Sequence, residues 1–299
     1  MASPSVNVSL SEQEMKLLQT LVYQECGMFF DERRAHFLQD RVNRRIKDNG
    51  LDGFYHYYKL LTGPKGRAEM AALVDNLTIN ETSFFRNKPQ LELFHKITLE
   101  EILHRKHQRR DWALKVWSAG CSTGQEPYTM AMLICDALSF YNLRNPLPIE
   151  TPSPKPLVPP PWKVEVLASD ISYRVLRTAQ EGSYSETQME PVDYSYRLRY
   201  FDKINDRYIV KKALKEAIHF DFHNLKTEFL PQHNDVIFCR NVMIYFDEAE
   251  QKRLIAKFHR CLKPGGFLFV GHAESLFGLS ESFRMVHVNN GTAYQRIEA

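Results

Sequence analysis

The sequence predicts an α/β fold, in which an all-helical N-terminal domain precedes a doubly wound, mostly parallel sheet. Up to about residue 79, apolar residues recur at helical spacing and no strand-like run appears. From Ala113 onward, short apolar strand-like runs alternate with helix-like runs, and the chain ends in two strand-like runs joined through Asn289-Asn290-Gly291. Such an order is typical of a parallel sheet with an antiparallel end.

Composition indicates an ordinary globular protein of 299 residues, enough for one large domain or two. Hydrophobic residues make up 43%, so a substantial core is expected, and the net charge of +3 is too small to indicate a nucleic-acid binder. No apolar run reaches the roughly 18 residues of a membrane helix, and the N-terminus lacks a signal-peptide pattern. The five scattered cysteines are typical of reduced thiols and form neither a disulfide framework nor a zinc site. We therefore expect a cytoplasmic protein.

Four helices are expected in the N-terminal domain, residues 1–79. The first starts at a capping box, Ser11 to Glu14, and the second runs from about Asp31 to Gly50. Two shorter helices are expected around residues 54–61 and around residues 70–77. Beside the apolar face of the second helix lie four arginines: Arg34, Arg41, Arg44 and Arg45. They form either a solvated face or a docking stripe for an acidic partner.

Residues 80–110 are expected to form an interdomain loop and a linker helix that Pro89 opens and that runs to about His107. The second domain follows as residues 111–299. Its expected elements are strands at 113–117, 163–168, 235–239 and 267–271, helices at 172–180 and 247–262, and a terminal hairpin of 284–288 with 293–297. Lys263 to Gly266 is expected to be a turn between a helix and a strand.

Two insertions interrupt this domain. Residues 145–161 include eight prolines and predict an extended surface linker. Residues 194–220 contain short strand-like pieces and predict a small β-subdomain.

The stretch around which the domain is organised runs from Val116 to Tyr128, where a strand, a glycine turn and a helix N-terminus follow one another. Gly120 and Gly124 allow the backbone to approach a ligand closely, as in nucleotide-binding folds. Their spacing is not the dinucleotide fingerprint, and Glu126 places a negative charge where a pyrophosphate would bind. The stretch therefore argues against NAD and for a ligand with a ribose and a cationic end, such as S-adenosylmethionine. The alternative is an ordinary tight turn.

Further polar side chains are expected at the carboxyl edge of the sheet, where ligands bind in open α/β folds. Asp170 follows the second strand and could accept hydrogen bonds from ribose hydroxyls, or could merely cap the next helix. Arg240, Asn241 and Tyr245 follow the buried strand near residue 239, and their alternative role is strand-end hydrogen bonding. The segment 221–225 could contact an adenine.

Taken together, four segments resemble the chemotaxis receptor methyltransferases, the CheR family. They are Asn80-x-Thr82-x-Phe84-Phe85-Arg86, the stretch Trp117 to Tyr128, Ala168-Ser169-Asp170-Ile171 and Phe238 to Phe246, with Gly271-His272-Ala273-Glu274-Ser275 in addition. The resemblance covers nearly the whole chain in the family's order. It implies a helical N-terminal domain, a class I methyltransferase domain with an inserted β-subdomain, and methyl transfer from S-adenosylmethionine to glutamate side chains of chemoreceptor cytoplasmic helices, with no metal. The product would be S-adenosylhomocysteine.

The resemblance also implies roles for individual residues. Asn80, Thr82 and Arg86 would reach the cofactor from the interdomain loop, while Glu126 would contact its methionine part and Asp170 its ribose. Asn224 and Leu225 would flank the adenine, Arg240 and Asn241 would line the pocket, and Arg86 with Tyr245 would act at the transfer site. The loop at Ile204-Asn205-Asp206 lacks the glycine-rich extension of members that tether to a receptor tail, which argues against tail docking.

The chemistry agrees with these residues, because a glutamate is already an anion at neutral pH and can attack the sulfonium methyl group directly. The protein then has mainly to align the reacting groups. Two other functions stay open on sequence grounds: a non-catalytic adaptor that binds S-adenosylmethionine at receptor arrays, and a methyltransferase for another acidic protein or a small carboxylate.

Overall fold

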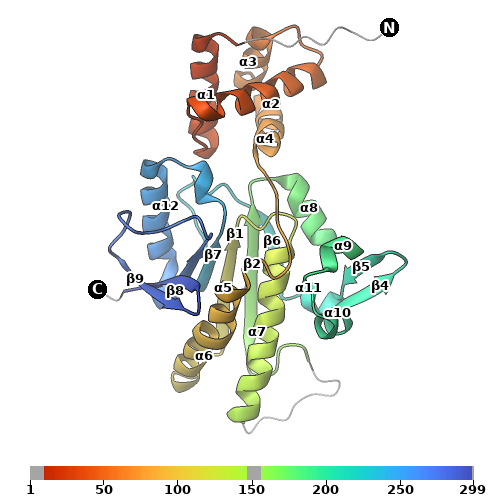
Figure 1. The fold of residues 1–299 in the computed structure, drawn as a ribbon, viewed down its shortest axis with the longest axis vertical. Coiled ribbons are helices and arrows are strands. Elements are labelled where there is room, and N and C mark those ends of the chain that lie inside the picture. The colour runs from red at the N-terminus through yellow and green to blue at the C-terminus, as the bar shows by residue number, and fades with distance from the viewer. Residues whose placement is uncertain (1–9, 147–155, 298–299) are drawn as a thin grey trace. The chain divides into compact units, whose positions relative to one another are not determined.

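The computed structural model describes residues 10–146 and 156–297. The chain divides into two compact units (Figure 1): Met1–Ile79 with Ile244–Glu250, and Asn80–Met243 with Gln251–Ala299. Most of the proline-rich insertion expected at 145–161 lies outside the described residues.

The smaller unit is helical. Its helices are α1 (Glu12–Cys26), the 3-10 turn η1 (Glu32–Arg34), α2 (Ala35–Asp48), α3 (Phe54–Thr62) and α4 (Gly66–Leu77). The capping box is confirmed, since the Ser11 side chain accepts from the Glu14 N–H and the Glu14 carboxylate accepts from the Ser11 N–H. Leu18, Val22, Leu38 and Val42 are fully buried, as the helical spacing predicts. Segment 244–250 joins this unit through a β-bridge between Met28 and Phe246.

The larger unit is built on a seven-stranded sheet with the order β6-β2-β1-β7-β8-β10-β9. Its strands are β1 (Ala113–Ala119), β2 (Lys163–Asp170), β6 (Ile218–Phe222), β7 (Asn234–Cys239), β8 (Leu262–Val270), β9 (Phe283–Val288) and β10 (Gly291–Arg296). The first five pair in parallel, and β10 pairs antiparallel with both β8 and β9. The predicted parallel sheet with an antiparallel end is therefore confirmed.

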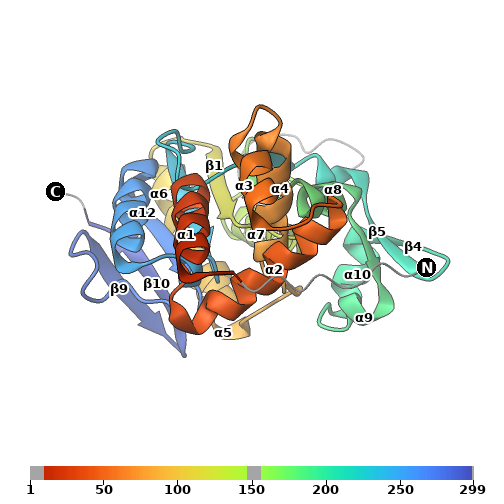
Figure 2. The same cartoon turned by 90° about the horizontal axis from the view of Figure 1, so that it is seen from above.

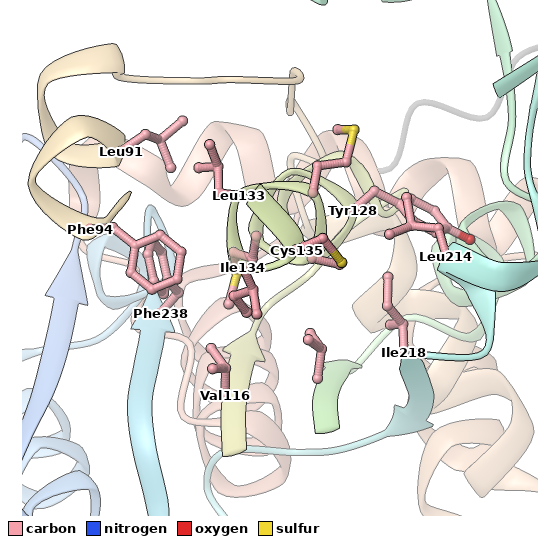
Figure 3. Close-up of a cluster of buried hydrophobic side chains, with 14 of the residues drawn as sticks. Leu91, Phe94, Val116, Tyr128, Leu133, Ile134, Cys135, Leu214, Ile218 and Phe238 are labelled. Atoms are coloured by element: carbon pink, nitrogen blue, oxygen red, sulfur yellow. The ribbon is translucent and has the colours of Figure 1, made fainter. Parts of the chain in front are cut away.

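Helices cover both faces of this sheet. Side chains of β1 point alternately to the two faces, and apolar side chains on each face pack against these helices. Trp117 points to one face, where its ring lies 5.6 Å from that of Phe258. Val116 points to the other face, into a core with α7 side chains, and Figure 3 shows Phe94 and Phe238 in contact there, with ring centroids 5.0 Å apart. The helices of the unit are α5 (Lys88–Leu93), the π-helical turn η2 (Phe94–Thr98), α6 (Leu99–Gln108), α7 (Gln125–Arg144), α8 (Tyr173–Glu181), α9 (Glu186–Met189), α10 (Tyr194–Tyr200), α11 (Lys212–Lys215) and, from Gln251 onward, α12 (Glu248–Cys261). The 3-10 turn η3 (Met243–Tyr245) precedes α12, and from Ile244 to Glu250 the chain belongs to the smaller unit.

A second sheet of three strands, β3 (Ser183–Ser185), β5 (Arg207–Val210) and β4 (Phe201–Ile204), is the small subdomain that the sequence predicted. Its bounds differ from the expected 194–220. The sheet already begins at Ser183, residues 194–200 form α10, and residues from Ile218 belong to the main sheet. In Figures 1 and 2 the small sheet and β9 lie at opposite sides of the larger unit.

The prediction of a turn at Lys263 to Gly266 is wrong, because these residues lie in β8, which begins at Leu262. The pairing of β7 with β8 shifts register between Asn234 and Val236, and Gly265 has φ of 70°. Proline and glycine are tolerated in a strand at an irregularity of this kind. The residues that resemble a turn in the sequence therefore form an irregular, bulged beginning of strand β8.

Candidate active site at the carboxyl edge of the sheet

The glycine turn, residues 120–124, connects β1 to α7 and adopts a backbone that its sequence allows. Gly120 and Gly124 have φ of 90° and 95°. A Cβ on Gly120 would come within 2.4 Å of the Val242 side chain, so this position has no room for one. The N–H groups of Gly120 and Cys121 donate to the Ser169 carbonyl at 2.8 and 2.9 Å, which fixes the turn against the end of β2.

Asp170, the last residue of β2, is buried beside this turn. Its carboxylate accepts hydrogen bonds from the Ser122 N–H at 2.9 Å and the Ser172 N–H at 3.0 Å. The helix cap of α8 is instead the Ser172 side chain, which accepts from the Val175 N–H. Asp170 thus joins the turn to β2 and is not the helix cap that the sequence left as its alternative role.

The site also contains an ion pair between the half-buried Glu126 and the buried Arg240. The guanidinium lies 3.4 Å from the Glu126 carboxylate, and their side chains are 4% and 14% exposed for Arg240 and Glu126 respectively. Ser118 donates a further hydrogen bond to Glu126 at 2.7 Å. Burial raises the pKa of Glu126, although Arg240, Ser118 and Arg86 oppose the rise. A carboxylate in this setting favours a cationic partner.

The segment 80–86 reaches the same place. The Arg86 carbonyl accepts from Arg240 at 2.7 Å, and the Arg86 guanidinium donates to the Glu81 carbonyl at 2.9 Å. The Ser122 hydroxyl donates to the Asn80 carbonyl at 3.1 Å. Thr82 is half-buried in this segment. The sequence-predicted residues Asn80 and Arg86 therefore lie beside Ser122 and Arg240.

The loop after β6 lies beside β2 because the His223 N–H donates to the Asp170 carbonyl at 2.9 Å. This contact places the half-buried Asn224 and Leu225 next in the chain, close to the end of β2. The Asn224 side chain accepts from the Lys226 N–H at 3.0 Å, which shapes the loop.

Glu274 also lies at this edge of the sheet, although the sequence analysis assigned it no role. Glu274, in the turn after β8, accepts hydrogen bonds from the N–H groups of Asn241 and Gly271. Asn241 has φ of 59°, and a Cβ on Gly271 would come within 2.6 Å of the Glu274 carboxylate. The sequence did contain a signal for Glu274, because the segment Gly271 to Ser275 is one of those that resemble the CheR family.

The remaining expected site residues belong to the helical unit. The Tyr245 hydroxyl lies 3.2 Å from both the N and the O of Ile79, and its ring lies 5.6 Å from the Arg34 guanidinium. On α2, Arg41 lies over the Phe37 ring and Arg44 is exposed. The side chain of Arg45 is occupied by Glu69, with a bidentate contact at 2.7 and 2.8 Å.

The donor set of the larger unit fits a ligand with a ribose, an ammonium and a carboxylate. Glu126 and Asp170 supply a half-buried and a buried carboxylate, and Nε of the buried Arg240 has no hydrogen-bond partner among the described residues. A buried donor without a partner indicates a place where an acceptor binds. Within the described ranges there is no group of three or more His, Cys, Asp or Glu side chains that could hold a metal. No helix there is long and apolar enough to cross a membrane.

Comparisons with known proteins agree with this arrangement. The family model described as "CheR methyltransferase, SAM binding domain" matches residues 80–144 and 158–292, and "CheR methyltransferase, all-alpha domain" matches 13–78. The chain is 33% identical to a chemotaxis protein methyltransferase of Salmonella typhimurium, covering 93% of this chain and 89% of that one. It is 32% identical to the protein of that name from Escherichia coli (93% and 90%) and 31% identical to the one from Borreliella burgdorferi (92% and 92%). The chain therefore belongs to the CheR family of chemotaxis methyltransferases, and S-adenosylmethionine is its cofactor.

Proposed function

We propose that this protein transfers the methyl group of S-adenosylmethionine to side-chain carboxylates of glutamates on the cytoplasmic helices of chemoreceptors. The observation that carries the proposal is the ion pair of the half-buried Glu126 with the buried Arg240, at the sheet edge where Asp170 holds the glycine turn. The relatives named chemotaxis protein methyltransferases match this chain over about nine tenths of their length. The bound cofactor supplies an electrophilic methyl group on a sulfonium ion.

In this proposal the residues of the larger unit hold the cofactor by its ends. Glu126 would pair with the ammonium group of the cofactor, and the free Nε of Arg240 would donate to the cofactor's carboxylate, because each is at least half-buried and has the complementary charge. Asp170 would accept from the ribose hydroxyls. Thr82 and the side chains of Asn80 and Asn241 would line the pocket, and Asn224 with Leu225 would flank the adenine.

The acceptor glutamate needs orientation more than activation. Its carboxylate oxygen forms a bond to the methyl carbon while the carbon–sulfur bond breaks and its electron pair passes to sulfur. The products are a methyl ester and S-adenosylhomocysteine, and no proton is transferred. We assign the guanidinium of Arg86 to orienting the carboxylate and Tyr245 to the transfer site, where alignment is the main contribution.

The test of this function is transfer of a labelled methyl group from the cofactor to a panel of receptor cytoplasmic fragments. We expect label on at least one fragment. Tight cofactor binding without transfer to any fragment would instead support a cofactor-binding adaptor. Transfer only to other acidic proteins or small carboxylates would contradict the receptor assignment.

Cofactor binding is expected to depend on pH through Glu126. Its pKa in the protein is raised, chiefly by burial, and only the ionised carboxylate attracts the ammonium. As the pH falls through the raised pKa, a growing fraction of Glu126 is protonated, so affinity should fall; above it, affinity should be constant. Calorimetry from about pH 5 to 8 measures this. Glu126→Gln should bind roughly tenfold or more weakly at neutral pH and lose the pH dependence. An equal slope in both proteins would remove Glu126 from the ammonium site.

We propose that the helical unit contacts the receptor, but only some of the four arginines predicted for this contact are available for it. Arg45 is committed to Glu69, and hydrogen bonds from Arg45, Asn49 and Tyr57 lower the pKa of that carboxyl group despite burial. Arg34 donates to the Phe29 carbonyl at 3.2 Å. Arg41 and Arg44 remain as the better candidates for pairing with an acidic helix.

Reversing these two charges, Arg41→Glu with Arg44→Glu, should lower the methylation rate at limiting receptor by roughly threefold to tenfold in low salt, because surface charges steer encounter. Its salt dependence should flatten, since screening has less attraction to remove. Cofactor affinity should stay unchanged. The control is Lys65→Glu with Arg67→Glu, the same charge reversal at exposed positions at the start of α4. Equal rates for the two double variants would mean that α2 presents only a solvated face.

A further inference from the structure

We infer that Tyr184, in the small sheet, is a positioning residue for S-adenosylmethionine binding. Tyr184 lies in β3, and its hydroxyl donates to the Thr123 carbonyl of the glycine turn at 2.8 Å. None of the cofactor residues implied by the family resemblance comes from this sheet. The inference rests on the proposed place of the cofactor at the glycine turn.

The Tyr184 side chain is fully buried and lies close to the glycine turn. Tyr184 is 0% exposed, and a Cβ on Gly124 would come within 2.9 Å of both its hydroxyl and the Ala179 side chain. Gly124 therefore serves two purposes: it adopts φ of 95° and it leaves room for the phenol. The backbone of the turn is fitted to Tyr184, and the Thr123 carbonyl would lack this donor without it.

The segment 80–86, which is also proposed to contact the cofactor, packs against the same small sheet. Phe84, in the segment 80–86, packs edge-on against the Tyr184 ring with centroids 4.8 Å apart. It also packs edge-on against Phe201 of β4, at 5.7 Å. All three rings are at most 4% exposed. The small sheet thus supports both the glycine turn and the 80–86 segment, through Tyr184 and Phe84.

A turn that is held before the ligand arrives does not have to be ordered during binding, and this strengthens affinity. Ser122 lies in the turn and Glu126 follows it by two residues, so a looser turn would misplace both the Ser122 N–H and the Glu126 side chain. Loss of the Tyr184 hydroxyl should therefore raise the dissociation constant for the cofactor and its KM. It should leave kcat at saturating cofactor nearly unchanged, because Tyr184 does not touch the reacting groups.

The test compares Tyr184→Phe with Tyr200→Phe in the full chain. Tyr200 is a matched control: it is a buried tyrosine of the same subdomain, and its hydroxyl faces the Met132 carbonyl of α7 at 3.5 Å, away from the turn. Calorimetry with S-adenosylmethionine should show a dissociation constant about fivefold higher for Tyr184→Phe, the scale of one neutral hydrogen bond. Tyr200→Phe should bind within about twofold of the wild type. Amide hydrogen exchange of the peptide spanning the turn should be faster only in Tyr184→Phe.

The outcomes separate the two proposals. If the wild type does not bind S-adenosylmethionine, the proposed cofactor site fails, whatever the variants do. If the wild type binds and both variants keep its affinity, the turn is held without Tyr184 and this inference is overturned. A fall in kcat with unchanged KM for the cofactor would also overturn it, because it would place Tyr184 at the transfer step.

Discussion

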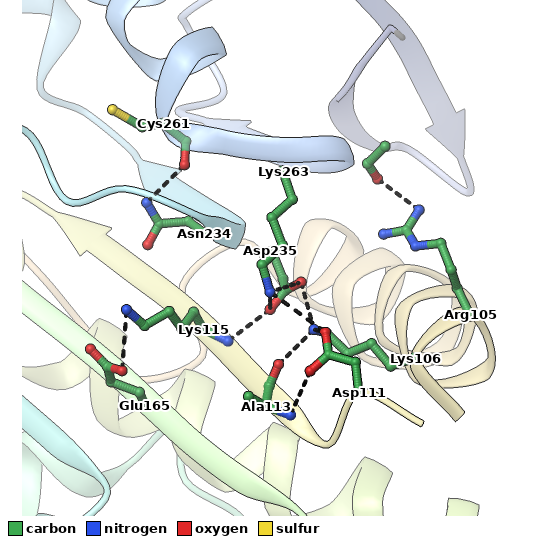
Figure 4. A network of polar contacts seen from close by, with 11 residues as sticks. Arg105, Lys106, Asp111, Ala113, Lys115, Glu165, Asn234, Asp235, Cys261 and Lys263 are labelled. Atoms are coloured by element: carbon green, nitrogen blue, oxygen red, sulfur yellow. Dashed lines mark hydrogen bonds and ion pairs between the residues drawn. The ribbon is translucent and has the colours of Figure 1, made fainter. Parts of the chain in front are cut away.

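Replacing Asp235 by alanine is expected to lower the free energy of unfolding by about 3–5 kcal/mol, the cost of leaving buried charges uncompensated. Asp235 is 1% exposed at the start of β7. Its carboxylate lies 3.0 Å from the Lys106 ammonium and 3.2 Å from that of Lys263, and it accepts from the Lys115 N–H at 2.8 Å (Figure 4). Lys106 is itself buried and also contacts Asp111 at 2.7 Å. Urea unfolding measures the loss.

A double variant tests the cause. In Asp235→Ala with Lys106→Met, one ammonium group is removed together with its carboxylate, so the loss should be smaller than for Asp235→Ala alone. Cofactor affinity of the folded protein should be unchanged in both, because Asp235 opens β7 and the cofactor edge lies at its other end. A single variant within about 1 kcal/mol of the wild type would show that the network contributes little.

Asp170→Ala should weaken S-adenosylmethionine binding by about 1.5–3 kcal/mol, the range for hydrogen bonds to a charged group. Two effects add: the proposed ribose acceptor is lost, and the Ser122 N–H of the glycine turn loses the acceptor that it has at 2.9 Å. Calorimetry of the purified variants measures the change in affinity.

The control for Asp170→Ala is Glu165→Ala, which removes an exposed carboxylate near the start of the same strand, β2. It tests whether the loss of any negative charge from β2 explains the effect. We expect Glu165→Ala to bind like the wild type. Equal affinities for the two variants would remove Asp170 from the ribose site.

Most of the fold could be predicted because its signals are local. The capping box, the helical spacing of α1 to α4 and the alternation of strands with helices each depend on neighbouring residues. The errors arose where tertiary packing overrides local signals. Pro264 and Gly265 suggest a turn, yet they lie within β8, in an irregular part of the strand between Leu262 and Phe267, which pair with Asn234 and Val236 of β7. The π-helical turn at Phe94 to Thr98 left no pattern that helical spacing reveals.

The site shows the same division. Gly120, Glu126, Asp170 and Arg240 follow strand ends or the glycine turn, so topology alone gathers them at one edge. The engagement of Arg45 by Glu69 could not be foreseen, because the two residues lie on different helices. Tyr184 carries no sequence signal either, since its link to Thr123 spans 61 residues of chain.

The most direct test of the proposed reaction is the chemical stability of the transferred label. The protein is incubated with methyl-labelled S-adenosylmethionine and a receptor cytoplasmic fragment, and the labelled fragment is then treated with mild alkali. Glutamate methyl esters hydrolyse and release labelled methanol, whereas methyl groups on nitrogen or thioether sulfur stay attached. We predict that alkali releases the label and that a fragment with its labelled glutamates changed to glutamine accepts none. Label that survives alkali, or that persists on the glutamine variant, would contradict methyl transfer to glutamate.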